Sequence, residues 1–165
     1  LFPDAKEVGI IYCSAEANSL FQARAITEYL SGYGYNVNEY TFSDSNDVAS
    51  VTQSACDGSD VLYVPTDNTA ASCAETINNV ALTAGVPIVA GEEGICKGCG
   101  VATLSISYYD IGHAAGLMAY DVLVNGVDPS TMEIRYATDF TKEYNPAIAD
   151  KLGIRIPDDY VAIEE

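Results

Sequence analysis

Short apolar runs alternate with longer amphipathic segments along most of the chain. The runs are rich in β-branched and aromatic residues and are bounded by turn-forming residues, a pattern typical of strands. Pro65 cannot donate to a neighbouring strand, so the run before it should end there. We predict buried strands over residues 8–13, 61–64, 87–90 and 101–106, a more exposed alternating strand over 36–42, and a strand over about 132–137.

Apolar residues at helical spacing occupy the segments between these strands. We predict helices over about 20–31, 70–84 and 111–124, a short helix after Asn46, and a short last helix opened by Asn145 and Pro146. The expected N-terminal caps of the three long helices are Asn18 or Ser19, Asn68 or Thr69, and Asp110. The glycine-rich stretch 91–99 is predicted to be a loop.

The predicted elements follow the order β-α-β-α-β-α-β-β-α-β-α. Alternation of this kind indicates an α/β protein whose parallel sheet is covered on both faces. Right-handed crossovers then favour a doubly wound sheet in a three-layer αβα sandwich. The expected order of its strands is 2-1-3-4-5.

Polar side chains follow the ends of several predicted strands. The carboxyl ends of parallel strands meet at one edge of a sheet, and ligands of open α/β sheets bind there. The candidate ligand-binding residues at this edge are Ser14, Glu16, Asn18, Ser19, Asp67, Asn68, Thr69, Glu92 and Tyr108. The alternative is that these residues serve only as turn and cap residues.

The candidate residues suit a zwitterionic ligand that carries a ring. The N-terminus of the helix after Asn18 can hold a carboxylate through free backbone N–H groups. Asp67 or Glu92 can hold an ammonium group. The aromatic residues available to pack against a ring are Tyr12, Tyr108 and Tyr109.

The charge balance excludes some partners. Acidic residues outnumber basic ones by 24 to 7, a formal net charge of −17. This disfavours nucleic acid, because neutralising phosphates requires Lys and Arg, and it disfavours an anionic membrane surface. No apolar run approaches the ~20 residues of a membrane span. The sequence begins at Leu1 without Met, so we interpret it as a piece of a longer protein.

Five cysteines are present, and only Cys96 and Cys99 have the spacing of a motif. A zinc site would need two further ligands, and the single histidine, His113, lies in a different, helical segment. A redox CxxC motif normally opens a helix, whereas this one is predicted to lie in a loop. The alternatives left are a local disulfide or two unpaired loop thiols.

No enzymatic pattern is convincing. A Ser-His-Asp triad would have to use His113 inside a helix, and neither a P-loop nor a GxGxxG motif occurs. Glu16 opposes a phosphate in the first loop, which disfavours a flavin. The first strand also ends without the acidic pocket of a receiver domain. We therefore expect no catalytic residue, no cofactor and no metal.

Several stretches match one known family in the right order: VGIIYCSAEANS, PTDNTAAS, PIVAGEEG, VATLSISYYDIGHAAGLMA and NPAIADKLGIRIP. They resemble the substrate-binding proteins of ABC transporters in the tryptophan/tyrosine-type group, which have the type I periplasmic-binding-protein fold. The resemblance spans nearly the whole chain and corresponds to the C-terminal portion of such a protein. Cys13 and the Cys96–Cys99 motif depart from the family pattern.

The resemblance implies two α/β lobes that close on an amino acid, aromatic by analogy, and present it to a membrane permease. The protein would be extracytoplasmic, either periplasmic or a cell-surface lipoprotein. Residues 14–19 match the first loop of the family's second lobe, residues 67–69 match its PTDNT segment, and Glu92 falls where the family has a polar or acidic residue.

The resemblance also implies a division of the chain. Residues 1–110 would form a ligand-binding lobe, 111–131 a helix that crosses to the missing first lobe, and 132–165 a strand, helix and tail that return. Without the first lobe, the crossing helix would fold back or pair with a second copy of the chain. Two other functions stay open: a sugar- or nucleoside-binding protein of the same fold, or a flavodoxin-like signalling or enzyme domain.

Overall fold

The computed structural model describes residues 1–164. Its elements are β1 (Glu7–Cys13), α1 (Ala17–Gly32), β2 (Asn36–Phe42), α2 (Val48–Asp57), β3 (Val61–Val64), α3 (Asn68–Ser72), α4 (Ala74–Ala84), β4 (Ile88–Ala90), α5 (Glu93–Cys99), β5 (Ala102–Ile106), α6 (Tyr108–Leu123), the 3-10 turn η1 (Pro129–Thr131), β6 (Phe140–Tyr144), α7 (Pro146–Leu152) and β7 (Val161–Ala162).

One sheet runs through the molecule in the order β2-β1-β3-β4-β5-β6-β7. The strands from β2 to β5 are parallel, which confirms the predicted order 2-1-3-4-5. β6 pairs antiparallel with β5, and β7 pairs parallel with β6. The α/β fold class is confirmed, with an antiparallel edge added to the predicted sheet.

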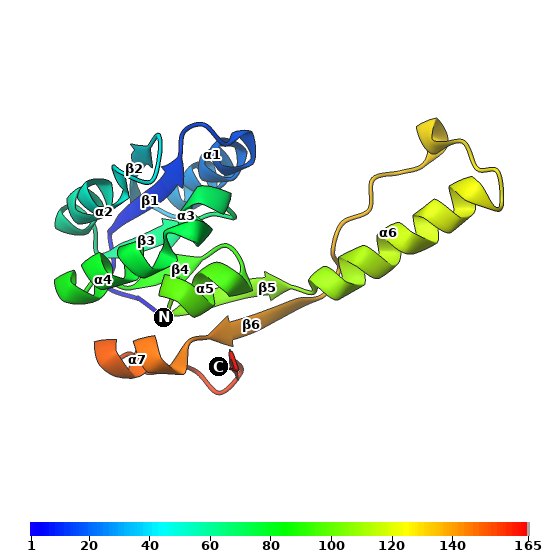
Figure 1. Cartoon of the computed structure of the whole chain (residues 1–165). Coiled ribbons are helices and arrows are strands. Elements are labelled where there is room, and N and C mark those ends of the chain that lie inside the picture. The colour runs from blue at the N-terminus through cyan, green and yellow to red at the C-terminus, as the bar shows by residue number, and fades with distance from the viewer. Residues whose placement is uncertain (165) are drawn as a thin grey trace.

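Helices pack on both faces of the sheet (Figure 1). Ile10 and Tyr12 of β1 pack with Ala23 of α1 on one face. Ile11, next to them along β1, points to the other face and joins the larger core cluster. β1 is therefore buried on both faces, which explains why its sequence is continuously apolar rather than alternating.

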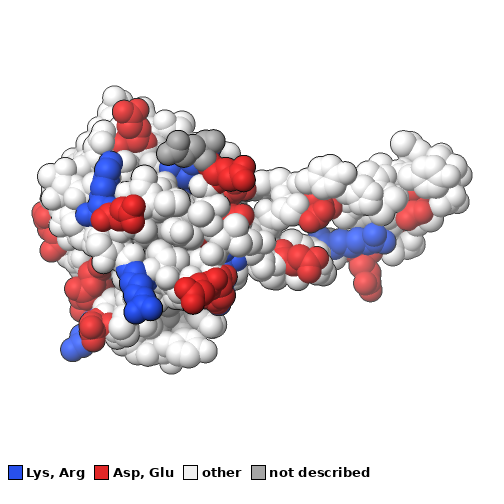
Figure 2. Space-filling view, turned by 90° about the horizontal axis from the view of Figure 1, so that it is seen from below, with Lys and Arg blue, Asp and Glu red and all other residues white. Residues whose placement is uncertain are grey.

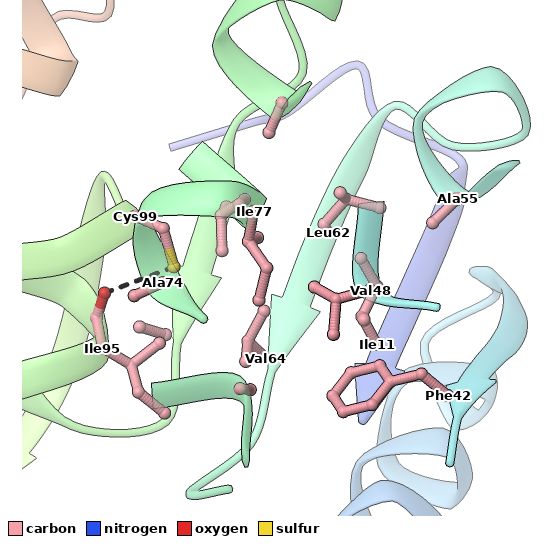
Figure 3. Close-up of a cluster of buried hydrophobic side chains, with 14 of the residues drawn as sticks. Ile11, Phe42, Val48, Ala55, Leu62, Val64, Ala74, Ile77, Ile95 and Cys99 are labelled. Carbon is pink, nitrogen blue, oxygen red and sulfur yellow. Dashed lines mark hydrogen bonds between the residues drawn. The ribbon is translucent and has the colours of Figure 1, made fainter. Parts of the chain in front are cut away.

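The larger core lies between the sheet and helices α2, α4 and α5. Figure 3 shows Phe42, Ile11 and Leu62 of three neighbouring strands converging with helix side chains in this cluster. Phe42, Ile77 and Ile95 are fully buried. β1, β3 and β4 pair side by side and parallel, so their carboxyl ends lie in one row. The core contacts keep the helices packed on this part of the sheet.

Helix α6 projects away from the sheet (Figure 1), and none of its residues is buried. Leu123, for example, is 82% exposed. The chain then returns along α6, where Arg135 to Asp139 share an apolar pocket with Ile111 and Met118. The division of the chain into a lobe, a crossing helix and a returning segment stays a prediction.

The strand predicted over about 132–137 is wrong. That segment has no regular structure, and the strand begins only at Phe140. The physical reason is pairing: residues 140–144 lie beside β5 and bond to it, whereas residues 132–137 run along the projecting α6, where no strand is available.

The glycine-rich stretch 91–99 is not a loop either, since its larger part forms α5. Glu92 caps this helix by accepting from the backbone N–H of Gly94 and Ile95. A Cβ on Gly98 would stand 2.6 Å from the Cβ of Ala74 in α4. The glycine thus permits two helices to approach closely, a role that its loop-like composition conceals.

Cys96 and Cys99 accordingly lie in a helix, and all five cysteines are free. The Cys99 thiol donates to the carbonyl of Ile95 at 3.4 Å (Figure 3). Burial raises the pKa of both Cys96 and Cys99 to about 12. The unpaired-thiol alternative is therefore confirmed, although its placement in a loop is wrong, and the thiolate needed for redox chemistry is disfavoured.

Other helix boundaries shift by a few residues. The helix predicted over 70–84 is divided at Cys73 into α3 and α4. The caps differ as well: Glu16 precedes α1, Asp67 caps α3, and Ser107 caps α6 in place of Asp110. Acidic side chains are spread over the body of the molecule and over the projecting α6 segment, with few basic ones between them (Figure 2). Over residues 1–164, no helix has the length and apolar character to span a membrane.

Candidate functional site

Glu16 joins the loop after β1 to the start of α3. Its Oε2 accepts from the backbone N–H and the Nδ2 of Asn68, at 3.0 and 2.9 Å. Its Oε1 accepts from the backbone N–H and the hydroxyl of Thr69, both at 2.8 Å. Asn68 and Thr69 begin α3, so this carboxylate satisfies N–H groups that have no partner inside the helix.

These bonds keep Glu16 ionised. Burial opposes the charge of the carboxyl, but the hydrogen bonds from Asn68 and Thr69 outweigh burial and lower its pKa from 4.5 to about 2. Glu16 therefore carries a full negative charge at neutral pH, and both of its oxygens are already engaged within the chain.

Asp67 precedes Asn68 and Thr69, the two residues that Glu16 binds, and is only 2% exposed. Its Oδ2 accepts from the backbone N–H of Cys13, the last residue of β1, at 2.7 Å. Its Oδ1 accepts from the backbone N–H of Ala70, also at 2.7 Å, and so caps α3. Asp67 thus connects the end of one strand to the helix that follows another strand.

Two side chains of α1 hold the segment between β3 and α3. The Nδ2 of Asn18 donates to the carbonyl of Thr66 at 2.9 Å, and the Oε1 of Gln22 accepts from the Thr66 N–H at 3.0 Å. Gln22 was not among the sequence candidates. Its position one helical turn after Asn18 is the signal that could have found it.

The first turn of α1 directs free donors toward the same edge. The first bond to the helix backbone runs from the N–H of Leu20 to the carbonyl of Glu16, at 3.1 Å. The N–H groups of Ala17, Asn18 and Ser19 precede it and have no partner within the helix. Ser19 is buried against this turn, whereas Ser14, on the loop before it, is exposed and donates to the carbonyl of Phe42 at 3.2 Å.

The loop after β4 lies against the same segment. The N–H of Gly91 donates to the carbonyl of Val64 at 2.7 Å, and a Cβ on Gly91 would come within 2.8 Å of the Thr66 nitrogen. Glu92 follows and caps α5. Burial and the nearby charge of Glu92 raise the pKa of Tyr108, the first residue of α6, which remains 56% exposed.

The structure therefore brings the nine candidate residues to the carboxyl edge of one sheet. The carboxylates of Glu16, Asp67 and Glu92 are all engaged with backbone N–H groups of helix starts. The N–H donors in the first turn of α1 and the exposed ring of Tyr108 remain available at this edge. Across residues 1–164, no group of three or more His, Cys, Asp or Glu side chains is placed to hold a metal ion.

Comparisons with known proteins agree on one family. The family model described as "ABC transporter substrate binding protein" matches residues 1–164. A tyrosine-binding protein of Clostridioides difficile (strain R20291) is 37% identical over 123 residues, which cover 74% of this chain and 36% of that protein.

Solved structures show the same similarity. A ligand-free, open substrate-binding protein with adhesive properties from Clostridium difficile has a TM-score of 0.78 at 34% identity, covering 98% of this chain and 56% of that one. An ABC domain in complex with L-Trp from Streptococcus pneumonia has a TM-score of 0.87 at 30% identity, covering 96% and 53%. The chain thus spans about half the length of these solved relatives.

Proposed function

Because the chain belongs to the ABC transporter substrate-binding protein family, we propose that it is the second ligand-binding lobe of an importer's binding protein, and that its ligand is an aromatic amino acid. The function is non-covalent capture, with no catalytic step. A tyrosine-binding relative and a relative solved with L-Trp support this ligand class.

The observation that carries the proposal is the junction of three loops at the carboxyl edge. Glu16 and Asp67 connect the end of β1 and the loop after it to the start of α3. Thr66, in the loop after β3, bonds to Asn18 and Gln22 of α1, and Gly91, in the loop after β4, bonds to Val64 at the end of β3. Such bonds fix the loops before a ligand arrives, which reduces the ordering that binding would otherwise require.

Each candidate residue has a role in this proposal. The ligand's carboxylate lies at the N-terminus of α1, near Asn18 and Ser19, where N–H groups and the helix dipole favour an anion. The charges of Glu16 and Glu92 provide negative potential for the ammonium group. The Ser14 hydroxyl, which donates to Phe42, can still accept a hydrogen bond from the ligand. Tyr108 packs against the ligand's ring. Buried Asp67, together with Asn68 and Thr69, holds the loop geometry.

The candidate site is open on one side. A single lobe encloses a ligand poorly, whereas binding sites derive affinity from enclosure, so the proposed function requires a second structure that covers the ligand. We propose that a first lobe covers this edge by hinge closure, that α6 packs on that lobe, and that the closed form is recognised by a permease outside the cytoplasm. Anchoring as a lipoprotein or residence in a periplasm both fit this placement.

Thermal stabilisation of the two-lobed protein tests the ligand class. Tryptophan, tyrosine and phenylalanine should raise the melting temperature in proportion to the logarithm of concentration, because a ligand stabilises the state it binds. Sugars and nucleosides serve as the contrasting set. Stabilisation by them alone would contradict an amino-acid ligand and support a sugar- or nucleoside-binding protein. Calorimetry on the 165-residue chain should show only weak binding or none.

A further inference from the structure

An apolar groove runs across the side of the sheet on which α1 packs. It begins beside Ile26 of α1 and has a volume of about 470 Å³. Tyr63 of β3, Val89 of β4 and Leu104 of β5 line it, and the register of these strands places the three side chains on one face. Leu104 is 56% exposed, although β5 has a neighbouring strand on either side. We call this surface the α1-side groove.

The α1-side groove is nearly free of charge. Among the described residues that line it, none is acidic, in a chain with 24 Asp and Glu residues. Of the same residues, Lys142 alone has a charged side chain, and it is paired with Asp159 at 2.6 Å. A contiguous apolar surface that is exposed to water typically marks an interaction site.

Helix α6 carries a second surface of this kind. We define the outer stripe of α6 as Tyr109, His113, Leu117, Tyr120 and Val124. These residues recur every three or four positions, so they share one face of the helix, and the rings of Tyr109 and His113 stack with their centroids 6.4 Å apart. Residues 111–120 contain no Asp, Glu, Lys or Arg, and Tyr109 is 80% exposed.

The outer stripe is left uncovered by its own copy. The pocket between α6 and the returning segment is lined by Ile111, Ala114 and Met118, which lie on the opposite face of the helix. The helix projects away from the sheet (Figure 1), and over residues 1–164 none of its side chains is buried. The stripe therefore cannot reach the groove of the same molecule.

We propose that the outer stripe of α6 docks in the α1-side groove of a second copy of the chain. Each copy has one stripe and one groove, so two copies related by a two-fold axis satisfy both contacts at once. The contact brings no like charges together, because neither surface carries an acidic side chain. A first lobe would compete for the same helix, so the pairing is expected of the 165-residue chain by itself, whatever ligand it binds.

The size of the contact indicates its strength. α6 has 16 residues, so a strip of about 24 Å by about 10 Å can lie in the groove. Two such strips, counted on both copies, bury about 1,000 Å², close to the lower limit of about 1,200 Å² for stable interfaces. A net charge of −17 on each copy opposes association. We therefore expect a weak dimer, with a Kd of about 10–100 µM.

Sedimentation equilibrium of the 165-residue chain tests the proposal. Over loading concentrations from about 10 to 500 µM, which bracket the expected Kd, the mass should rise from 17.5 kDa toward twice that value. A mass that stays at 17.5 kDa throughout would overturn the proposal. Because no ligand is added, that result would leave the proposed function untouched.

One substitution on each surface tests where the copies meet. Leu104→Glu in the groove and Leu117→Glu in the stripe should each raise the Kd of the dimer at least about tenfold, because a carboxylate would be buried without a partner. Leu104 lies opposite Lys142 in the ladder, so its replacement by glutamate suits the fold. Phe21→Glu is the matched control, since Phe21 is an exposed residue of α1 outside the groove. Loss of the dimer in L117E but not in L104E would indicate contact between two α6 helices and overturn docking in the groove.

Mixing the two variants gives a result that a folding defect cannot imitate. The stripe of L104E and the groove of L117E are both intact, so a mixed dimer keeps one of the two contacts. The mixture should therefore associate more tightly than either variant alone. No gain on mixing would contradict a reciprocal exchange of helices.

The salt dependence of the wild-type chain provides a test that needs no variant. Association should strengthen as NaCl rises from about 0.05 to 0.5 M, because salt screens the repulsion between two acidic copies. Weaker association at high salt would indicate that ion pairs hold the copies together, and would contradict an apolar contact.

Discussion

Glu16 and Thr69 are joined twice, with both the backbone N–H and the hydroxyl of Thr69 lying 2.8 Å from the same oxygen of Glu16. The two residues are 53 positions apart in the sequence. This contact, with its counterpart at Asn68, makes Glu16 a link between two loops of the candidate site. Its charge contributes to the edge, but its hydrogen-bonding capacity is used to hold the loops together.

Glu16→Gln should lower the free energy of unfolding by about 1–3 kcal/mol. The amide N–H₂ group of glutamine would replace one oxygen that now accepts hydrogen bonds from Asn68 or Thr69, so two donors would face each other. Urea denaturation at pH 7 measures this change. The folded pKa of Glu16 is depressed to about 2, so its contribution is present above 4.5 and is lost as pH falls toward 2. The variant should therefore show less loss of stability over that range. An identical acid profile in both proteins would disprove the linkage.

Asp67→Asn should lower the free energy of unfolding by about 2–3 kcal/mol. One of the two carboxylate oxygens becomes an N–H₂ group, which then faces a backbone N–H donor in a buried site. Asp60 provides a matched control. It accepts from the N–H groups of Lys6 and Glu7 through a single oxygen, which asparagine retains. Denaturant midpoints of the two variants should differ clearly, and similar midpoints would show that Asp67 does not hold the junction.

Gly91→Ala should destabilise the fold by about 1–3 kcal/mol, because the new Cβ would meet the backbone of Pro65 and Thr66 within 3.0 Å. Gly112 in α6 has nothing within 4 Å of its Cβ position. Gly112→Ala should instead stabilise the helix by about 0.5–1 kcal/mol. Calorimetric melting of the two variants gives opposite shifts if the loops after β3 and β4 are in close contact.

Ala17→Asp tests the proposed position of the ligand's carboxylate. An acid in the first turn of α1 agrees with the helix dipole, so the variant should fold normally. Placed beside a bound carboxylate, the same charge should weaken amino-acid binding by the two-lobed protein at least about tenfold. Ala17→Asn is the uncharged control. An unchanged affinity of the aspartate variant for the amino acid would show that the ligand's carboxylate does not bind at the N-terminus of α1.

Local patterns in the sequence account for most of the fold. The apolar runs at β1 and β3 and the turn residues after them determine strands, strand ends and the row of polar residues at one edge, because each of these depends on near neighbours. Strand alternation with helices then limits the sheet order to very few arrangements.

The tertiary structure decided what depended on distant neighbours. Residues 132–137 have a sequence suited to a strand, yet without a strand beside them they remain irregular. Residues 93–99 have the composition of a loop, yet Glu92 caps them into a helix that α4 accommodates at Gly98.

The same distinction applies to the candidate site. The sequence by itself determined which polar residues gather at the edge, since that follows from strand direction alone. Only the folded chain decided that Glu16 bonds to Asn68 and Thr69 and that Asp67 bonds to Cys13. A carboxylate binds whichever donors the packed sheet brings within reach, and here those donors lie more than fifty residues away.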